Sequence, residues 1–141
     1  MSCVNVRGCP IGEGRPKTIL PIVEGTEAAI LEKAVQFSTL PADCVEWRVD
    51  HFDDARTPGA VARCLAKLRV ALKDKLLLVT IRTKAEGGEL ALRHTEYTDL
   101  LHTIPVSYTH LLSGHPHHRR LHPPCCKKPE SAPHIGLMGG L

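Results

Sequence analysis

The stretch CVEWRVDHF, residues 44–52, decides the fold because apolar and charged side chains alternate along it. The apolar positions are Val45, Trp47 and Val49, and the charged positions are Glu46, Arg48 and Asp50. This period of two predicts a β-strand with one apolar face and one charged face. Helical patterns flank the strand, so we expect a covered sheet, where charges are costly unless they are paired or hold a polar ligand.

Strand and helix patterns alternate on both sides of this stretch. Apolar runs at residues 19–23 and 76–82 predict two more strands, and helices are expected to begin near Thr26, Thr57 and Thr95. The second helix has a predicted buried stripe of Val61, Cys64, Leu65, Leu68 and Leu72. Such alternation with short links is typical of a parallel α/β sheet, either open and doubly wound or part of a (β/α)8 barrel.

Smaller signals refine this picture at the chain start and at the second helix. A short hairpin is expected ahead of the first strand, with Gly12 and Gly14 supplying the turn. Thr57 is expected to cap the second helix, with Pro58 at its first position. No G-x-G-x-x-G follows the first strand, which disfavours dinucleotide binding.

Composition excludes several classes of protein. The 141 residues contain no run near the ~20 apolar residues of a membrane span, and the start MSCVNVRGCP lacks a secretion leader. Six cysteines without a C-x-x-C pair predict reduced thiols and a cytoplasmic protein. Residues 1–104 hold 14 basic and 14 acidic side chains, so the net charge of +3 comes from residues 105–141. A basic domain that binds nucleic acid is therefore not expected.

The composition changes at residue 105. Residues 105–141 hold six of the eleven prolines and six of the nine histidines, with no strand or helix period. We therefore expect a domain of residues 1–104 and a disordered or artefactual tail of residues 105–141.

The segment PVSYTHL, residues 105–111, resembles the translation of a transposon-end sequencing adaptor. The alternative function is a non-catalytic fragment whose His/Cys-rich basic tail binds metal or nucleic acid, although its spacing fits no zinc motif.

Charged residues are expected to meet where the strands end. Glu46 and Arg48 share one face of their strand, Arg82 is the predicted last residue of the next, and Glu86 follows in the loop. Ligands of parallel α/β folds bind at this carboxyl end of the sheet. Two interpretations stay open, an internal network of Glu46 with Arg48 or Arg82, and a pocket for an anionic or polyhydroxylated small molecule.

The motifs EWRVDHF (residues 46–52) and TIRTKAEGGE (residues 80–89), with GEGRPKTILPIVEGT before them, resemble type I 3-dehydroquinate dehydratase. The resemblance covers residues 1–104 and implies a (β/α)8 TIM barrel closed at one end by an N-terminal hairpin, homodimeric when complete. It implies dehydration of 3-dehydroquinate to 3-dehydroshikimate in the shikimate pathway, through a lysine Schiff base and without metal or other cofactor. Glu46, Arg48 and Arg82 would bind substrate, and Glu86 would be catalytic by orienting a histidine.

The chain departs from this family in length. A complete barrel needs about 250 residues, and three of eight strand–helix units are predicted here. The family's imine-forming lysine and base histidine come from later strands, so we expect an incomplete barrel that is inactive alone. Neither Lys84, expected in solvent, nor His51, expected to be structural, is a convincing substitute. Pro21 stands where some family members use a serine toward substrate.

Overall fold

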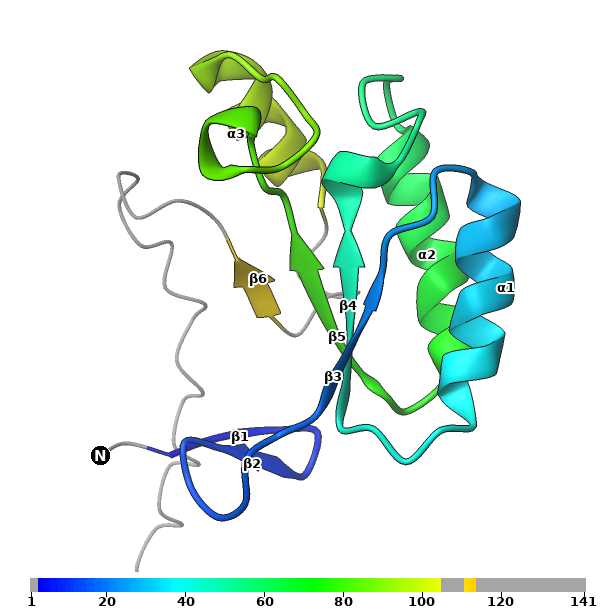
Figure 1. Cartoon of the computed structure of the whole chain (residues 1–141), viewed down its shortest axis with the longest axis vertical. Coiled ribbons are helices and arrows are strands. Elements are labelled where there is room, and N and C mark those ends of the chain that lie inside the picture. The colour runs from blue at the N-terminus through cyan, green and yellow to red at the C-terminus, as the bar shows by residue number, and fades with distance from the viewer. Residues whose placement is uncertain (1–2, 105–110, 114–141) are drawn as a thin grey trace, which may run out of the picture.

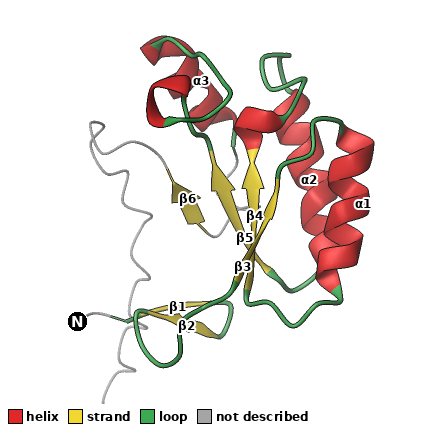
Figure 2. Ribbon diagram, viewed as in Figure 1, coloured by secondary structure: helices red, strands yellow, loops and turns green. Residues whose placement is uncertain are grey.

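The computed structural model describes residues 3–104 and 111–113 of the chain. Within these residues, three helices accompany a sheet of four parallel strands (Figures 1 and 2). The sheet contains, in spatial order, β3 (Ile19–Ile22), β4 (Cys44–Arg48), β5 (Leu76–Thr80) and β6 (Leu111–Ser113). The helices that follow β3, β4 and β5 are α1 (Glu27–Ser38), α2 (Ala60–Leu72) and α3 (His94–Thr103). An antiparallel hairpin, β1 (Val4–Val6) and β2 (Cys9–Ile11), precedes them.

The arrangement confirms the predicted α/β class with a parallel sheet. Helices α1 and α2 lie side by side on one face of the sheet, whereas α3 lies beyond the end of β5 (Figure 1). The hairpin lies near the amino-terminal ends of the strands (Figure 1). The two ends of the sheet therefore differ, and the carboxyl ends of β4 and β5 are followed by short 3₁₀ turns at Val49–His51 and Lys84–Glu86.

The core forms where the sheet faces the helices. Ile22, Trp47 and Val79 are paired in register across β3, β4 and β5, and all three are fully buried. From the helix side, the predicted stripe of α2 is buried as expected, with exposed fractions between 0 and 2%. Trp47 also contacts Phe52, with ring centroids 5.9 Å apart. Burial of these apolar side chains is the main stabilising contribution to the fold.

The start of α1 agrees with the sequence prediction. The Thr26 hydroxyl accepts a hydrogen bond from the backbone N–H of Ala29 at 3.3 Å, and Glu27 occupies the first turn. The hydroxyl satisfies one of the amide donors that a helix start leaves unpaired, and the acidic side chain complements the helix dipole.

The predicted start of α2 is wrong. The helix begins at Ala60, and its N-cap is Gly59 in the left-handed region at φ 73°, not Thr57. Thr57 instead lies in a turn, where its carbonyl accepts a hydrogen bond from the N–H of Ala60 at 3.0 Å. The Thr-Pro pair therefore marks the turn before the helix, and Pro58 is not helical.

The hairpin and β4 also differ from expectation. The hairpin turns at Arg7 and Gly8, which both have positive φ angles, of 49° and 77°, rather than at Gly12 and Gly14. Two successive positive φ angles are characteristic of a two-residue turn that follows strand twist. Strand β4 ends at Arg48, because residues 49–51 turn into a 3₁₀ helix instead of extending the strand to residue 52.

The predicted irregular tail is interrupted by a strand. Residues 111–113 form β6, which pairs in parallel with β5 through Leu78, Val79 and Thr80. The sequence analysis missed it because three residues are too few to establish a period of two. The remainder of the tail, and with it the predicted disorder or adaptor origin, lies outside the described residues.

Four cysteines fall within the described residues, and none forms a disulfide there. Cys44 at the start of β4 and Cys64 in α2 are buried, whereas Cys3 is exposed and Cys9 is half-buried. Burial raises the pKa of the Cys44 thiol to about 11 and that of Cys64 to about 12.

Among the helices of residues 3–104, none has the length and apolar character that a membrane span requires.

Replacement of Leu68 by alanine tests the packing of α2 on the sheet. Leu68 is fully buried, so Leu68→Ala is expected to lower the free energy of unfolding by about 2–5 kcal/mol. Val70 lies on the same helix but is 79% exposed, so Val70→Ala is expected to change it by less than about 0.5 kcal/mol. Equilibrium urea unfolding of both variants measures the difference, and equal losses would contradict the predicted orientation of α2.

Candidate functional site at the carboxyl ends of the strands

The candidate site begins with the alternation along β4. Because Val45 and Trp47 are buried in the core between sheet and helices, Glu46 and Arg48 lie on the opposite face of the sheet. On that face Glu46 is in register with Pro21 of β3 and Leu78 of β5, and Arg48 is in register with Thr80. Glu46 and Arg48 therefore share one face of the strand, as the alternation predicted.

Glu46 has a hydrogen-bonding partner on the neighbouring strand. The Thr80 hydroxyl donates to Glu46 Oε1 at 2.6 Å, and Thr80 is only 5% exposed. A hydrogen bond to an ionised carboxylate is stronger than one between neutral groups, and it fixes the orientation of the side chain. The carboxylate of Glu46 is thus held beside β5 rather than extended freely.

Arg48 is held by Asp50, two residues along the chain. Its Nε donates to Asp50 Oδ1 at 2.8 Å and its Nη2 donates to Oδ2 at 2.7 Å, which makes a two-pronged ion pair. The Asp50 side chain is fully buried, and that of Arg48 is 14% exposed. Although burial raises the pKa of Asp50, the hydrogen bonds from Arg48 and from the Glu89 amide outweigh it, so that pKa lies below its ordinary value. The bonds to Asp50 raise the pKa of Arg48.

An internal network of Glu46 with Arg48 or Arg82 was one interpretation of the sequence, and the structure shows other partners for the charged residues of β4. Within the described residues, Glu46 forms no ion pair with Arg48 or Arg82. Thr80 and Asp50 are instead the partners of the two charged residues. Each charge is therefore satisfied locally, and both lie on a face of β4 and β5 that α1 and α2 leave uncovered.

Arg82 differs from its predicted position. Strand β5 ends at Thr80, so Arg82 is not the last strand residue but lies two residues beyond, after the buried Ile81. Its side chain is exposed, and the described part of the chain offers it no hydrogen bond or ion pair. The neighbouring backbone is tightly packed, because a Cβ on Gly88 would lie 2.1 Å from the Arg82 carbonyl oxygen.

Glu86 lies on the loop that follows Arg82, as predicted. Its Oε2 accepts hydrogen bonds from the Thr83 amide at 3.1 Å and from the Thr83 hydroxyl at 2.8 Å. The Glu86 amide in turn forms a capping box with Thr83 around the short 3₁₀ helix. The carboxylate is therefore oriented by the loop that carries it.

Lys84 and His51, which the sequence analysis weighed as a nucleophile and a base, lie in the segments that follow β5 and β4. Lys84 is exposed, as expected for a solvated amine. His51 lies in the turn after β4, with Nε2 3.8 Å from Asp50 Oδ2 and a side chain that is 29% exposed. This position agrees with a structural histidine at a strand end.

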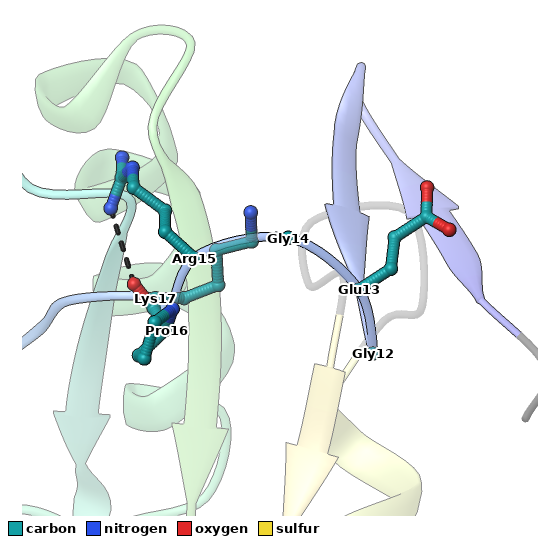
Figure 3. Close-up of a pocket in the computed structure, with 6 residues that line it drawn as sticks. All are labelled: Gly12, Glu13, Gly14, Arg15, Pro16 and Lys17. Carbon is teal, nitrogen blue, oxygen red and sulfur yellow. Dashed lines mark hydrogen bonds between the residues drawn. The ribbon is translucent and has the colours of Figure 1, made fainter.

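Two shallow cavities in the described residues lie away from Glu46 and Arg48. One, of about 210 Å³, is formed by residues 12–17 between the hairpin and β3, and Figure 3 shows its lining side chains. There Arg15 donates to the Pro16 carbonyl at 3.2 Å (Figure 3) and pairs with Asp43 at 2.6 Å, ahead of β4. The other, of about 350 Å³, is lined by Thr83, Lys84, Ala85, Ala91, Leu92 and Arg93. Neither encloses a cluster of catalytic groups.

A metal site is not found in the described part of the chain. Residues 3–104 contain no group of three or more histidine, cysteine, aspartate or glutamate side chains arranged to hold a metal ion. The histidines and cysteines of the alternative metal or nucleic-acid function, such as His115 and Cys125, lie outside the described residues.

Sequence reasoning missed the roles of Asp50 and Thr80. Asp50 was counted with the charged face of the strand, but the turn after Arg48 brings it back to the guanidinium. An aspartate two residues after an arginine at a strand end is a usable signal, because a turn there places both groups within reach. The role of Thr80 can be recognised once the register of β4 and β5 is known, because its hydroxyl then lies on the same face as Glu46 and close to it.

Known proteins resemble this chain over the segment that carries the strands, the helices and the candidate site. A family model for type I 3-dehydroquinase matches residues 18–111. The 3-dehydroquinate dehydratase of Bacillus subtilis is 44% identical over 101 residues, which are 72% of this chain and 40% of that protein. The enzyme of the same name from Lactiplantibacillus plantarum is 42% identical over 101 residues, with the same coverage of each chain.

Solved structures agree with this relationship. The 3-dehydroquinate dehydratase of Enterococcus faecalis superposes with a TM-score of 0.72 and 38% identity, over 77% of this chain and 46% of that one. The type I enzyme of Clostridium difficile, solved with covalently modified comenic acid, gives 0.68 and 36%, over 70% and 39%. The chain thus spans about two fifths of the length of the relatives it matches. By sequence and by fold, the chain belongs to the type I 3-dehydroquinase family.

Proposed function

We propose that this chain is the N-terminal portion of a type I 3-dehydroquinate dehydratase, which converts 3-dehydroquinate to 3-dehydroshikimate in the shikimate pathway. The family match and the names of the relatives support the reaction. We further propose that the strand–helix units of residues 1–104 are part of an incomplete (β/α)8 barrel, cytoplasmic and homodimeric in its full-length form. The parallel β3–β4–β5 order with a helix after each strand supports this assignment.

The observation that carries the proposal is the presence of two charged side chains on the face of β4 that α1 and α2 leave uncovered. Glu46 and Arg48 lie side by side on that face, near the carboxyl end of the strand, and each is oriented by a hydrogen bond. In (β/α)8 enzymes this end holds the active site, and inward-facing side chains line it. We infer that Glu46 and Arg48, together with Arg82 from the loop after β5, bind the hydroxyl-bearing ring of the substrate.

The chemical step needs groups beyond these. By resemblance to the family, a lysine forms an imine with the C3 ketone of the substrate, and the imine accepts the electron pair when a histidine removes a proton from C2. The same histidine helps the hydroxide leave, and no metal or other cofactor is required. We propose that Glu86 orients this histidine and that both the lysine and the histidine come from later strand–helix units. The chain by itself is then inactive.

The purified chain tests this last statement directly. With 3-dehydroquinate it is expected to form no conjugated enone product in an absorbance assay, because the imine-forming lysine is absent. Borohydride reduction in the presence of substrate is expected to leave its mass unchanged. The Bacillus subtilis enzyme serves as the positive control in both measurements. A substrate-sized mass adduct on this chain would overturn the proposed absence of the lysine.

A chimera tests the proposed substrate-binding residues. Residues 18–104 replace the aligned segment of the Bacillus subtilis enzyme, and the chimera is expected to be active. In that background Glu46→Gln and Arg82→Met are each expected to lower kcat/KM at least about tenfold, because each removes a charged hydrogen-bonding group. Glu86→Gln is expected to act mainly on kcat, since that residue acts through the histidine.

The matched control is Arg63→Met, which removes an exposed arginine from α2. Its kcat/KM is expected to stay within about twofold of the unmodified chimera, because Arg63 lies on α2, which covers the face of the sheet opposite to Glu46 and Arg48. If Glu46→Gln and Arg82→Met were as active as this control, the assignment of the binding residues would be wrong.

A further inference from the structure

Asp50 contacts both chain segments that carry residues of the proposed site, the end of β4 and the loop after β5. Its carboxylate accepts hydrogen bonds from Nε and Nη2 of Arg48, at 2.8 and 2.7 Å, and Oδ2 also accepts from the backbone N–H of Glu89 at 3.2 Å. Arg48 belongs to β4, whereas Glu89 belongs to the loop after β5. One carboxylate therefore connects β4 to a loop residue that lies 39 positions after Asp50 in the chain.

Burial makes this connection costly to lose. The Asp50 side chain has no exposed surface, so its charge is compensated by these donors and not by water. Removal of one partner from a buried ion pair leaves an uncompensated charge and is strongly destabilising. His51 also lies near, but its Nε2 is 3.8 Å from Oδ2, beyond hydrogen-bonding distance.

The ion pair limits how Arg48 can be used. The Nε and Nη2 edge of the guanidinium faces Asp50, which leaves Nη1 and the outer N–H of Nη2 for a ligand. Because Asp50 already balances the charge of Arg48, the pair together is neutral. Its free end therefore attracts a second carboxylate less strongly than an unpaired arginine would, and it can still donate to a hydroxyl or carbonyl oxygen.

The bond to Glu89 fixes the loop that carries the other proposed residues. Arg82 and Glu86 lie on this loop, and Gly88 packs against the Arg82 carbonyl so closely that a side chain would not fit. The Glu89 amide follows Gly88 directly. A shift of Glu89 away from Asp50 would thus be transmitted to the Arg82 backbone.

We propose that Asp50 is a positioning residue, which holds Arg48 and the loop of residues 82–89 in the arrangement that binds substrate without touching the substrate itself. This inference rests on the proposed function for its substrate. It assigns to Asp50 a role distinct from the direct contacts of Glu46, Arg48 and Arg82. Both bonds are formed by groups of this chain alone.

Nitrogen-15 NMR of the full chain tests the inference. In the unmodified protein, the Arg48 Nε–H is expected to exchange with water at least about tenfold more slowly than the Nε–H of Arg15, whose side chain is 64% exposed. The Glu89 amide is expected to exchange at least about tenfold more slowly than the same amide in an unstructured peptide. In Asp50→Asn, both signals are expected to lose that protection. Titration with 3-dehydroquinate is expected to show an affinity at least about tenfold weaker than that of the unmodified protein.

The matched control is Asp43→Asn, which removes the ion pair with Arg15 and is expected to leave both protected signals and the affinity unchanged. If Asp50→Asn fails to fold, the exchange rates of the unmodified protein still decide, because fast exchange of either group would overturn the inference. Retained affinity in a folded Asp50→Asn would also overturn it. If 3-dehydroquinate shifts no signal of the unmodified protein while Asp50→Asn loses both protections, Asp50 still holds Arg48 and the loop, and the proposed binding of substrate by this chain is wrong.

Discussion

The alternation along β4 is the constraint on which the rest of the structure depends. Once Trp47 packs between the sheet and the helices, a strand period of two requires Glu46 and Arg48 to face the other side. A shift of register by one residue would bury both charges against α1 and α2 and expose the only tryptophan. Packing of the core and orientation of the candidate site are therefore set by the same residues.

The charges on the uncovered face are stabilised by short-range partners. Glu46 uses the adjacent strand through Thr80, and Arg48 uses the turn at the end of its own strand through Asp50. This arrangement keeps two ionised groups fixed near the same strand end, which is a condition for recognising a small polar ring. The capping box of Glu86 extends the same principle to the loop after β5.

Long periodic patterns allowed much of the fold to be predicted from the sequence. The stripe of α2 and the apolar strands were recognisable, because burial imposes a regular spacing over many residues. The ends of elements were less predictable. Thr57 and Pro58 fit a helix start, yet the backbone enters α2 through Gly59 in a left-handed conformation that no spacing reveals. The turn at residues 49–51 likewise depends on tertiary contacts of Asp50, which a linear pattern does not contain.

The candidate site was predictable only where a residue followed from a regular spacing. Glu46 and Arg48 followed from the strand period, whereas the early end of β5 moved Arg82 out of the expected strand position. The motif resemblance agreed with the family match over residues 18–111. Thr80 and Asp50 needed three-dimensional register and a turn, respectively, before their contacts could be recognised.

The buried thiols have a practical consequence. Cys44 and Cys64 are almost without exposed surface, and their raised pKa values leave nearly no thiolate at neutral pH. Among the four cysteines of residues 3–104, alkylating reagents should therefore label Cys3 first and reach the two interior sulfurs only after β4 or α2 has separated from the core. Cys44 and Cys64 thus act as natural reporters of local opening, and their labelling rates would distinguish fraying at the strand start from loss of the helix layer.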